Sequence, residues 1–299
     1  MIITTGRIPD NYDKQFDSVS IRSFRTIQSD WTNLINTDSL TSRYLNESRL
    51  DDFKQGAEVF EGEPVSYQSY EPHGSKKIGY RSFAVGAEAS RIAVLDDMYN
   101  IIGTVPSAIG KAMAYNRDVL AWDLINSGFV STVRKTIDGN PLFYTAHPLA
   151  DGTSFSNMAS SVALSKTSLR TALLQGRNLT DRWGRPAPVE YKYLVVVPEL
   201  LDTANEIVNT PIGLYTADGT INTESRKGLT VVSAPFLTGT TQWGLMTQKN
   251  MHNLTFYWRT RPFNTGTIDP HTGSRMWAQW MDCNAEFMDP YGVYWSAGA

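Results

Sequence analysis

Side chains that could hold a metal or act as nucleophiles are few in this sequence and lie far apart. Cys283 is the only cysteine, so no internal disulfide can form, and its apolar neighbours indicate an unreactive thiol in a reducing compartment. The sequence therefore predicts no metal ion and no other cofactor. The four histidines are His73, His147, His252 and His271. None of them has a second possible metal ligand at the spacing of a motif such as HExxH.

The motifs of nucleophilic and nucleotide-binding enzymes are also missing. Gly152-Thr153-Ser154 begins like the nucleophile elbow GxSxG but lacks the final glycine, and neither GxGxxG nor GxxxxGK[ST] occurs. His147 and Asp151 could pair as a general base and its orienting carboxylate, yet the surrounding turn residues favour a loop with a hydrogen-bonded histidine. Asp96 and Asp97 are more typical of a solvated boundary before a helix than of an acidic site. We therefore expect no enzyme, with an unrecognised catalytic site as the alternative.

Length and charge narrow the class of protein. The chain has 299 residues, of which 41% are hydrophobic and 19% charged, which suffices for one or two globular units. Lys and Arg number 27 against 30 Asp and Glu, and the net charge of −3 provides no basic face, so contact with nucleic acid should be weak and non-specific. No run approaches the ~18 apolar residues of a membrane span, and no signal peptide is recognisable, so no membrane partner is expected.

The first 49 residues have a weak, polar pattern with widely spaced large apolar residues. This segment offers too little apolar surface to fold alone, although residues 18–40 could contain a short helix. We interpret residues 1–49 as an arm that becomes ordered only on another surface. Its candidate contacts with a neighbouring subunit are Phe16, Phe24, Trp31 and Leu34.

Residues 58–91 change to the period of two that is typical of strands. A Pro/Gly-containing turn at 71–75 divides them, which predicts a long two-stranded hairpin. Because an isolated ribbon is marginal in water, it should lean on a neighbouring molecule. A lysine pair beside the predicted tip more often protects a strand edge than makes a specific contact. The candidate contacts of this hairpin are Tyr67, Tyr70, His73, Lys76, Lys77 and Tyr80.

The rest of the chain mixes helical and strand patterns without regular βαβ alternation, which predicts the α+β class. A long helix is expected over 104–126, with Thr104 as its N-cap and Gly128 as its stop, and a shorter one should end at Gly176. The apolar run 191–197 predicts a buried strand. A helix should begin at Pro198, an exposed loop should cover 210–227, and strands are expected over 229–234, 243–247, 254–260 and 276–287.

Several segments also carry the motifs of a known family. Residues 61–65 (EGEPV) and 80–91 (YRSFAVGAEASR) look like its extended loop. Residues 138–149 (DGNPLFYTAHPL), with Asn157 after them, are similar to its DG…LFxTxHP…N stretch, which is the most specific signal. Three further segments resemble its axial domain: 194–200 (LVVVPEL), 227–235 (KGLTVVSAP) and 243–245 (WGL). Together these segments resemble the Mu-type major head subunit family of tailed phages.

The resemblance implies the Hong Kong 97-type capsid fold and a structural subunit that self-assembles into the icosahedral phage head enclosing the genome. None of the matching motifs is catalytic in that family. The implied location is the virion capsid, assembled in the host cytoplasm. The implied domains are an N-terminal arm (1–49), an extended loop (50–92), a peripheral domain with a spine helix (93–190), an axial domain (191–253) and return strands (254–299).

The implied partners are other copies of the chain, arranged as pentamers and hexamers, with a portal and, in some heads, decoration proteins. Packaged DNA should be touched only weakly and non-specifically. Because the long helical N-terminal extension of one family variant is missing, a separate scaffolding protein or none is expected. Lys76 and Lys77 do not by themselves establish covalent cross-linking. The alternatives are an encapsulin-like compartment shell and another phage assembly protein such as a tail-tube subunit.

Overall fold

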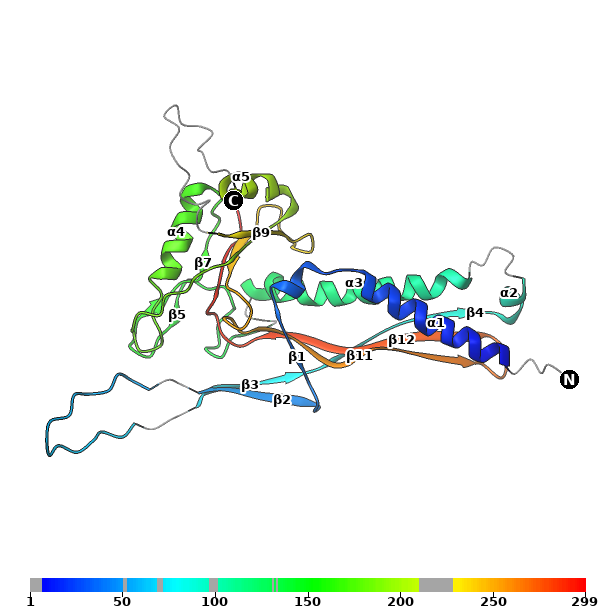
Figure 1. The fold of residues 1–299 in the computed structure, drawn as a ribbon, viewed down its shortest axis with the longest axis horizontal. Helices are drawn as coiled ribbons and strands as arrows, with labels where there is room; N and C mark the ends of the chain where they lie inside the picture. Colours follow the sequence, from blue (N-terminus) through cyan, green and yellow to red (C-terminus); the bar gives the residue numbers. More distant parts are fainter. Residues whose placement is uncertain are drawn as a thin grey trace, which may run out of the picture.

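The computed structural model describes residues 7–50, 53–68, 72–96, 102–130, 132, 134–209 and 228–299. Helices pack on two β-sheets to form an elongated body, and a two-stranded ribbon projects from it (Figure 1). Helices and strands follow one another without βαβ repetition, which confirms the predicted α+β class. Within the described part of the chain, no helix is long and apolar enough to cross a membrane.

Helix α3 (Val105–Asn126) is the spine of the body and agrees with the predicted long helix. It packs on one face of a four-stranded sheet, and their contact buries Met113 against apolar residues such as Met281 and Cys283. Strand β11 is far longer than the predicted 254–260 because β12 pairs with it almost to its end. The strand order is β1 (Asn36–Ser39), β11 (Leu254–Ile268), β12 (Arg275–Phe287) and β4 (Arg81–Ala89).

A second, five-stranded sheet lies at the other end of the body, with helices α4 (Lys166–Arg177) and α5 (Leu201–Asn209) packed on it. Its strand β8 is fully buried at Leu194, as the predicted buried strand requires. Strands β7 and β13 of this sheet, and helix α4 that packs on it, lie outside residues 191–253. The sheet and its helices are therefore built from several separate segments of the chain. The strand order is β7 (Met158–Ala159), β13 (Val293–Ser296), β10 (Trp243–Met246), β8 (Tyr193–Val196) and β9 (Thr230–Ser233).

Short elements complete the described part of the chain. The predicted loop at 210–227 lies outside the described residues. The ribbon consists of β2 (Tyr44–Leu50) and β3 (Pro72–Gly79), and a small hairpin consists of β5 (His147–Pro148) and β6 (Ser154–Phe155). The remaining helical turns are η1 (Asp30–Asn33), α2 (Arg91–Leu95), η2 (Ile102–Thr104), η3 (Ser127–Phe129) and η4 (Pro198–Leu200).

The N-terminal segment is not an arm that waits for another subunit. Helix α1 (Arg7–Thr26) lies along α3, and η1 follows it onto the sheet (Figure 1). Phe16 stacks on Trp277 with ring centroids 5.5 Å apart, and Trp31 stacks on Phe256 at 4.8 Å. The interpretation as an arm that docks on a neighbouring subunit is therefore corrected, because α3 and the sheet of the same subunit supply the surface that orders it. All four predicted anchors are buried in their own subunit: Phe16, Phe24, Trp31 and Leu34.

The projecting ribbon is formed by β2 and β3, so the predicted hairpin over 58–91 is wrong in its register and its tip. Ser48 pairs with Ser75 and Arg49 with His73, which leaves Gly74 as the extra residue of a β-bulge at a φ of +69°. The glycine signal at 71–75 thus marks a bulge rather than a turn. Strand β4 belongs to the four-stranded sheet, where it pairs with β12.

The roles predicted for two glycines as helix stops differ from the structure. Gly176 lies inside α4, where a Cβ would come within 2.4 Å of the Tyr191 ring, so this glycine permits close packing rather than ending the helix. Gly128 lies in η3 and is required by a similar approach of the Phe143 ring, at 2.8 Å from an added Cβ. Thr104 precedes α3 as predicted, although its side chain makes no capping hydrogen bond.

Candidate assembly surfaces

Asp138 and His147, nine residues apart, contact each other to fold a loop. His147 is fully buried, with Nδ1 at 2.6 Å from Oδ2 of Asp138 and Nε2 at 3.3 Å from the Leu142 carbonyl oxygen. Its ring stacks on Phe155 at 5.1 Å between centroids. The hydrogen-bonded histidine predicted from the sequence is therefore confirmed, but its partner is Asp138 and not Asp151.

Asp138 is held in its ionised form by this loop. Burial alone would raise the pKa of its carboxyl group, but hydrogen bonds from His147 and Thr136 and from the Asn140 backbone N–H lower the pKa to about 2. Asp151 is different, because it accepts its bonds from the neighbouring Thr153 in an exposed turn. The acidic partner of the buried histidine is thus the aspartate of the DG motif.

Asn157 closes the same loop from the other side. Its Oδ1 accepts the Tyr144 backbone N–H at 2.9 Å, and its Nδ2 donates to the carbonyl oxygens of Leu142 at 2.7 Å and Pro290 at 3.1 Å. One side chain therefore bonds three backbone groups, and it shares one of them, the Leu142 carbonyl oxygen, with His147. The DG…LFxTxHP…N stretch, the most specific motif in the sequence, is therefore explained by the folding of this loop, without a catalytic role.

The other buried histidine and the single cysteine also lie in the interior of the subunit. His252 is buried, and its Nε2 lies 2.8 Å from the carbonyl oxygen of Leu34, while burial lowers its pKa. Burial also raises the pKa of Cys283 to about 12, which agrees with the expected unreactive thiol. Across the described ranges, no group of three or more His, Cys, Asp or Glu side chains could hold a metal ion.

The base of the ribbon is fixed to the body by Lys76. Its Nζ lies 2.7 Å from Oε2 of Glu286 and donates to the carbonyl oxygens of Lys135 and Phe287 at 2.9 and 2.8 Å. Arg134 lies beside Glu286 and pairs with Asp123 at 2.7 Å, so the same network reaches the end of α3. Lys76 was predicted as a contact at the hairpin tip, and the bulge at Gly74 is the reason that it points into the subunit instead.

The loop at the end of the ribbon, residues 55–67, is the exposed part of the structure that we call the tip. A turn at its centre is closed by the Glu63 N–H, which donates to the Phe60 carbonyl oxygen, and Gly62 has a φ of +90°. Its charged residues are all acidic, namely Glu58, Glu61 and Glu63. Its large apolar residues are exposed, namely Val59, Phe60, Val65 and Tyr67, the last to 95%.

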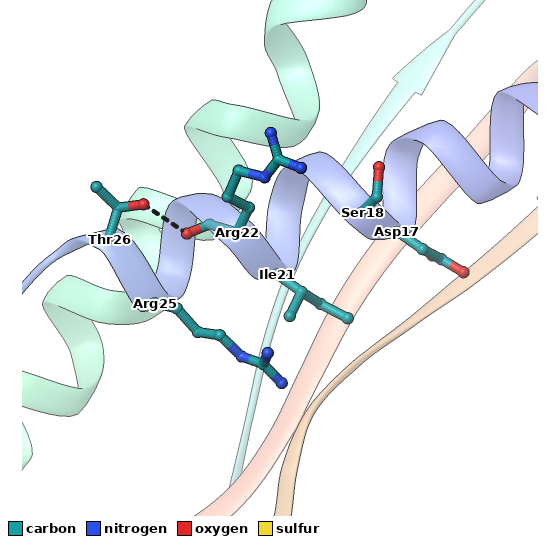
Figure 2. Close-up of a pocket in the computed structure, with 6 residues that line it drawn as sticks. All are labelled: Asp17, Ser18, Ile21, Arg22, Arg25 and Thr26. Carbon is teal, nitrogen blue, oxygen red and sulfur yellow. Dashed lines mark hydrogen bonds between the residues drawn. The ribbon is translucent and has the colours of Figure 1, made fainter.

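The outer face of α1 carries a shallow groove of about 620 Å³. Figure 2 shows Arg22 and Arg25 extending from the helix in different directions, with the half-buried Ile21 near them. Asp17 and Ser18 lie farther towards the start of the helix. Among the described residues, neither arginine has an ion-pair partner. The groove is therefore a predominantly basic surface with an apolar floor, which the sequence analysis did not find because its spacing is visible only once α1 is known to be a helix.

A second exposed surface is the face of the four-stranded sheet that points away from α3. Phe263 and Trp280 are cross-strand partners there and are 43% and 42% exposed. Beside them a hollow of about 380 Å³ lies over Gly86, Thr265 and Ala278. The sequence analysis missed this face because it ended the strand at Thr260, whereas β11 continues to Ile268.

The predicted contact residues of the ribbon occupy different environments. Tyr67 is exposed in the tip, whereas Tyr70 lies outside the described residues and His73 belongs to the bulge in β3. Lys77 is exposed, with Nζ at 3.6 Å from the centre of the Tyr44 ring. Tyr80 is half-buried at the end of the ribbon, where its ring lies 3.9 Å from the Arg259 guanidinium.

Residues 75–296 match the sequence model of a family described as phage capsid protein. The match covers the five-stranded sheet, three of the four strands of the other sheet (β4, β11 and β12) and helices α2 to α5. The chain belongs to the phage capsid protein family. The family is structural rather than enzymatic, and its members form the capsid of the virion. No curated protein sequence matches the chain.

Solved capsids share the fold at low sequence identity. The capsid of cyanophage P-SCSP1u matches with a TM-score of 0.61 and 12% identity, over 90% of this chain and 88% of that one. The capsid of a native GTA particle gives a TM-score of 0.60 with 11% identity over 90% of both chains. The virus-like particle from Pyrococcus furiosus gives 0.54 and 10% over 95% and 99%. These likenesses show the Hong Kong 97-type capsid fold.

The subunit therefore assembles into a phage head, as the sequence predicted. The loop around Asp138 and His147 belongs to the subunit's own architecture. Within the described part of the chain, the tip, the groove on α1 and the outer sheet face are exposed surfaces outside that loop.

Proposed function

We propose that the chain is a major head subunit of the Mu type, which forms the pentamers and hexamers of an icosahedral shell. The DG…LFxTxHP…N stretch supports the subfamily, since Asp138, His147 and Asn157 each make the buried contacts that such a motif requires. In this proposal the four-stranded sheet with α1 and α3 is the peripheral part. The five-stranded sheet with α4 and α5 lies towards the capsomer axis.

The observation that carries the assembly mechanism is the tip. Isolated two-stranded ribbons have marginal stability in water. A loop that exposes Val59, Phe60 and Val65 is stabilised when a partner covers these side chains. The base of the ribbon is fixed by Lys76, so the tip projects in a defined direction (Figure 1). A tip of this kind fits a contact with another copy of the chain.

The groove on α1 of a neighbouring copy is the receiving surface that we propose. The tip carries three glutamates and no lysine or arginine, whereas the groove carries Arg22 and Arg25 against one acidic residue, Asp17, with the apolar Ile21 beside them. Complementary charge at the rim steers association and fixes its register, and apolar side chains in the middle supply most of the buried area. Each subunit would thus donate one tip and receive another, a head-to-tail contact that closes into rings.

Further partners of the head follow from the same proposal. A portal, a separate scaffolding protein and decoration proteins would join the shell, while packaged DNA would be touched only weakly because the chain is slightly acidic. One solved neighbour is the capsid of bacteriophage JBD30 decorated with minor capsid protein trimers, with 17% identity and a TM-score of 0.55 over 71% of this chain and 92% of that one. In this chain the exposed sheet face around Phe263 and Trp280 has room for such a protein.

A charge exchange tests the docking of the tip. The double variant Arg22→Glu and Arg25→Glu should fold normally but leave unassembled subunits, because both sides of the contact are then acidic. Adding Glu58→Lys, Glu61→Lys and Glu63→Lys to the same chain should restore shells. Sedimentation and negative-stain electron microscopy of the full chain measure both outcomes.

The matched control is Arg177→Glu, which reverses an exposed arginine at the end of α4, far from the groove in sequence. It should assemble like the wild type. Shells formed at normal yield by the Arg22 and Arg25 double variant would rule out the groove as the receiving surface. Closed shells that enclose a host protein and form without a portal would favour the compartment-shell alternative.

A further inference from the structure

The short turn at 180–186 is built rigidly although it lies at the surface. Asp181 organises it, since its carboxylate accepts the backbone N–H groups of Trp183 and Arg185, both at 2.9 Å. The Asp181 N–H donates to the Arg185 carbonyl oxygen at 2.8 Å, and Gly184 takes the left-handed φ of +77° that closes the turn. A backbone bond from Ala150 to Arg182 fixes the turn to the body.

Two side chains of this turn contact the ribbon. The Arg185 Nη1 donates to the Phe53 carbonyl oxygen at 2.9 Å, and the Asp181 carboxylate holds the Nε of the same guanidinium at 2.6 Å. The Lys54 ammonium lies over the Trp183 ring, 4.6 Å from its centre. The contacts join residues that are about 130 positions apart in the sequence, so they fix the ribbon relative to the body.

The same point of the ribbon is closed across its two arms. The Lys54 N–H donates to Oε1 of Gln68 at 2.8 Å, and the Gln68 Nε2 donates back to the Lys54 carbonyl oxygen at 3.4 Å. Holding Lys54 therefore holds both ends of the tip. We call the set Lys54, Trp183 and Arg185 the ribbon latch.

We propose that Arg185 and Trp183 are positioning residues for assembly, which hold the ribbon of the free subunit in the direction that a second copy of the chain receives. The inference rests on the proposed function, because it assigns a role to the docking of the tip. Arg185 and Trp183 hold the ribbon at residues 53 and 54, and the large apolar side chains of the tip are exposed. The latch therefore presents the tip rather than hiding it, and an autoinhibitory contact would have covered Phe60 or Tyr67.

The physical gain is preorganisation. A loop that is already fixed when it meets its partner loses less conformational freedom on docking than a loop that swings freely. Removing the latch should therefore weaken association without removing any contact between subunits. From the usual cost of ordering such side chains, the critical subunit concentration for shell formation should rise about 3- to 10-fold.

The experiment uses the full-length subunit and two measurements. Hydrogen exchange of residues 53–68 in unassembled subunits reports the mobility of the ribbon, and light scattering against concentration reports the critical concentration. The variants are Arg185→Ala, Arg185→Lys and Lys54→Ala, with Arg177→Ala as the control for loss of an exposed arginine. Lys54→Ala leaves the 180–186 turn intact, so it separates the latch from the folding of that turn.

We expect faster exchange and a higher critical concentration in Arg185→Ala and Lys54→Ala, partial recovery in Arg185→Lys, and wild-type behaviour in Arg177→Ala. Unchanged exchange in Arg185→Ala and Lys54→Ala would overturn the latch. Faster exchange with unchanged assembly would overturn its role in positioning. A parallel variant in which a Gly/Ser linker replaces residues 55–67 keeps the two proposals apart: if it still assembles normally, the docking of the tip fails instead.

Discussion

The ammonium of Lys76 lies close to three oxygen atoms: Oε2 of Glu286 at 2.7 Å and the carbonyl oxygens of Phe287 and Lys135 at 2.8 and 2.9 Å. Lys76→Met keeps the length of the side chain but removes this network and leaves Glu286 with the more distant Arg134, 3.6 Å away. We expect a loss of about 2–3 kcal/mol in the free energy of unfolding, since a partly buried charge becomes poorly paired. Urea unfolding followed by tryptophan fluorescence measures it.

The neighbouring lysine is the matched control for that change. Lys77 is exposed, and its ammonium only lies over the Tyr44 ring, so Lys77→Met should cost less than about 1 kcal/mol. Equal losses in the two variants would contradict the assignment of Lys76 as the residue that fixes the ribbon base. A loss confined to Lys76→Met would support it.

Asp138→Asn should make the free energy of unfolding of the subunit less dependent on pH in the acidic range. The pKa of Asp138 falls to about 2 in the folded state from its usual 3.8, so folding favours the ionised carboxylate. This contribution is complete above about pH 4 and is lost as the pH falls from 3.8 through 2. The wild type should therefore be more stable than the variant at pH 7, and the difference should shrink as the pH falls towards 2. Chemical unfolding at pH 7, 4 and 3 follows the difference.

Asp151→Asn is the comparison for the same pH series. Asp151 is exposed and bonds only within its own turn, so its replacement should change the free energy of unfolding by less than about 0.5 kcal/mol at pH 7. If Asp151→Asn destabilised the subunit more than Asp138→Asn did, the buried histidine would have been given the wrong partner.

Asp118→Asn should release the N-terminal helix before the rest of the subunit unfolds. One carboxylate oxygen of Asp118 accepts from Ser29 at 2.6 Å, Arg117 at 2.8 Å and Trp31 at 2.9 Å. The amide leaves the buried Arg117 without its counter-charge, which should cost about 3 kcal/mol. Limited proteolysis should then cut residues 7–35 faster than in the wild type. Asp30→Asn, an exposed change in η1, should leave the cleavage rate unchanged.

The sequence predicted those features that depend on local pattern or on a specific motif. The long helix, the buried strand at 191–197 and the loop around His147 were identified because helical spacing, an apolar run and the DG…HP stretch are each visible in a few residues. The direction of the ribbon was not predicted, because a glycine such as Gly74 is typical of a β-bulge as well as of a turn. The contact of Trp31 with its own subunit was also missed, since its partner Phe256 lies more than 200 positions away.

The assembly surfaces show the same limit. The acidic and apolar residues of the tip are consecutive in the sequence, but the prediction placed the tip elsewhere once the bulge had been taken for the turn. Arg22 and Arg25 gain significance only when α1 is folded and its inner face is covered. Trp183 and Arg185 acquire a role only through Phe53 and Lys54, which no local pattern connects to them.

Gly110→Ala should destabilise the subunit although it replaces a helical glycine with the best helix former. In an unpacked helix the exchange would add about 1 kcal/mol of stability. Here an added Cβ would come within 2.2 Å of the Ser20 carbonyl oxygen and 3.1 Å of the Ser23 Cβ, and a backbone atom of α1 cannot turn aside as a flexible side chain does. Helix α1 must move away from α3, so we expect a net loss of about 1–3 kcal/mol and faster hydrogen exchange in α1. Gly79→Ala, where an added Cβ meets no atom within 4 Å, is the control and should stay within about 0.5 kcal/mol of the wild type. A higher melting temperature for Gly110→Ala would mean that the two helices do not cross at this glycine.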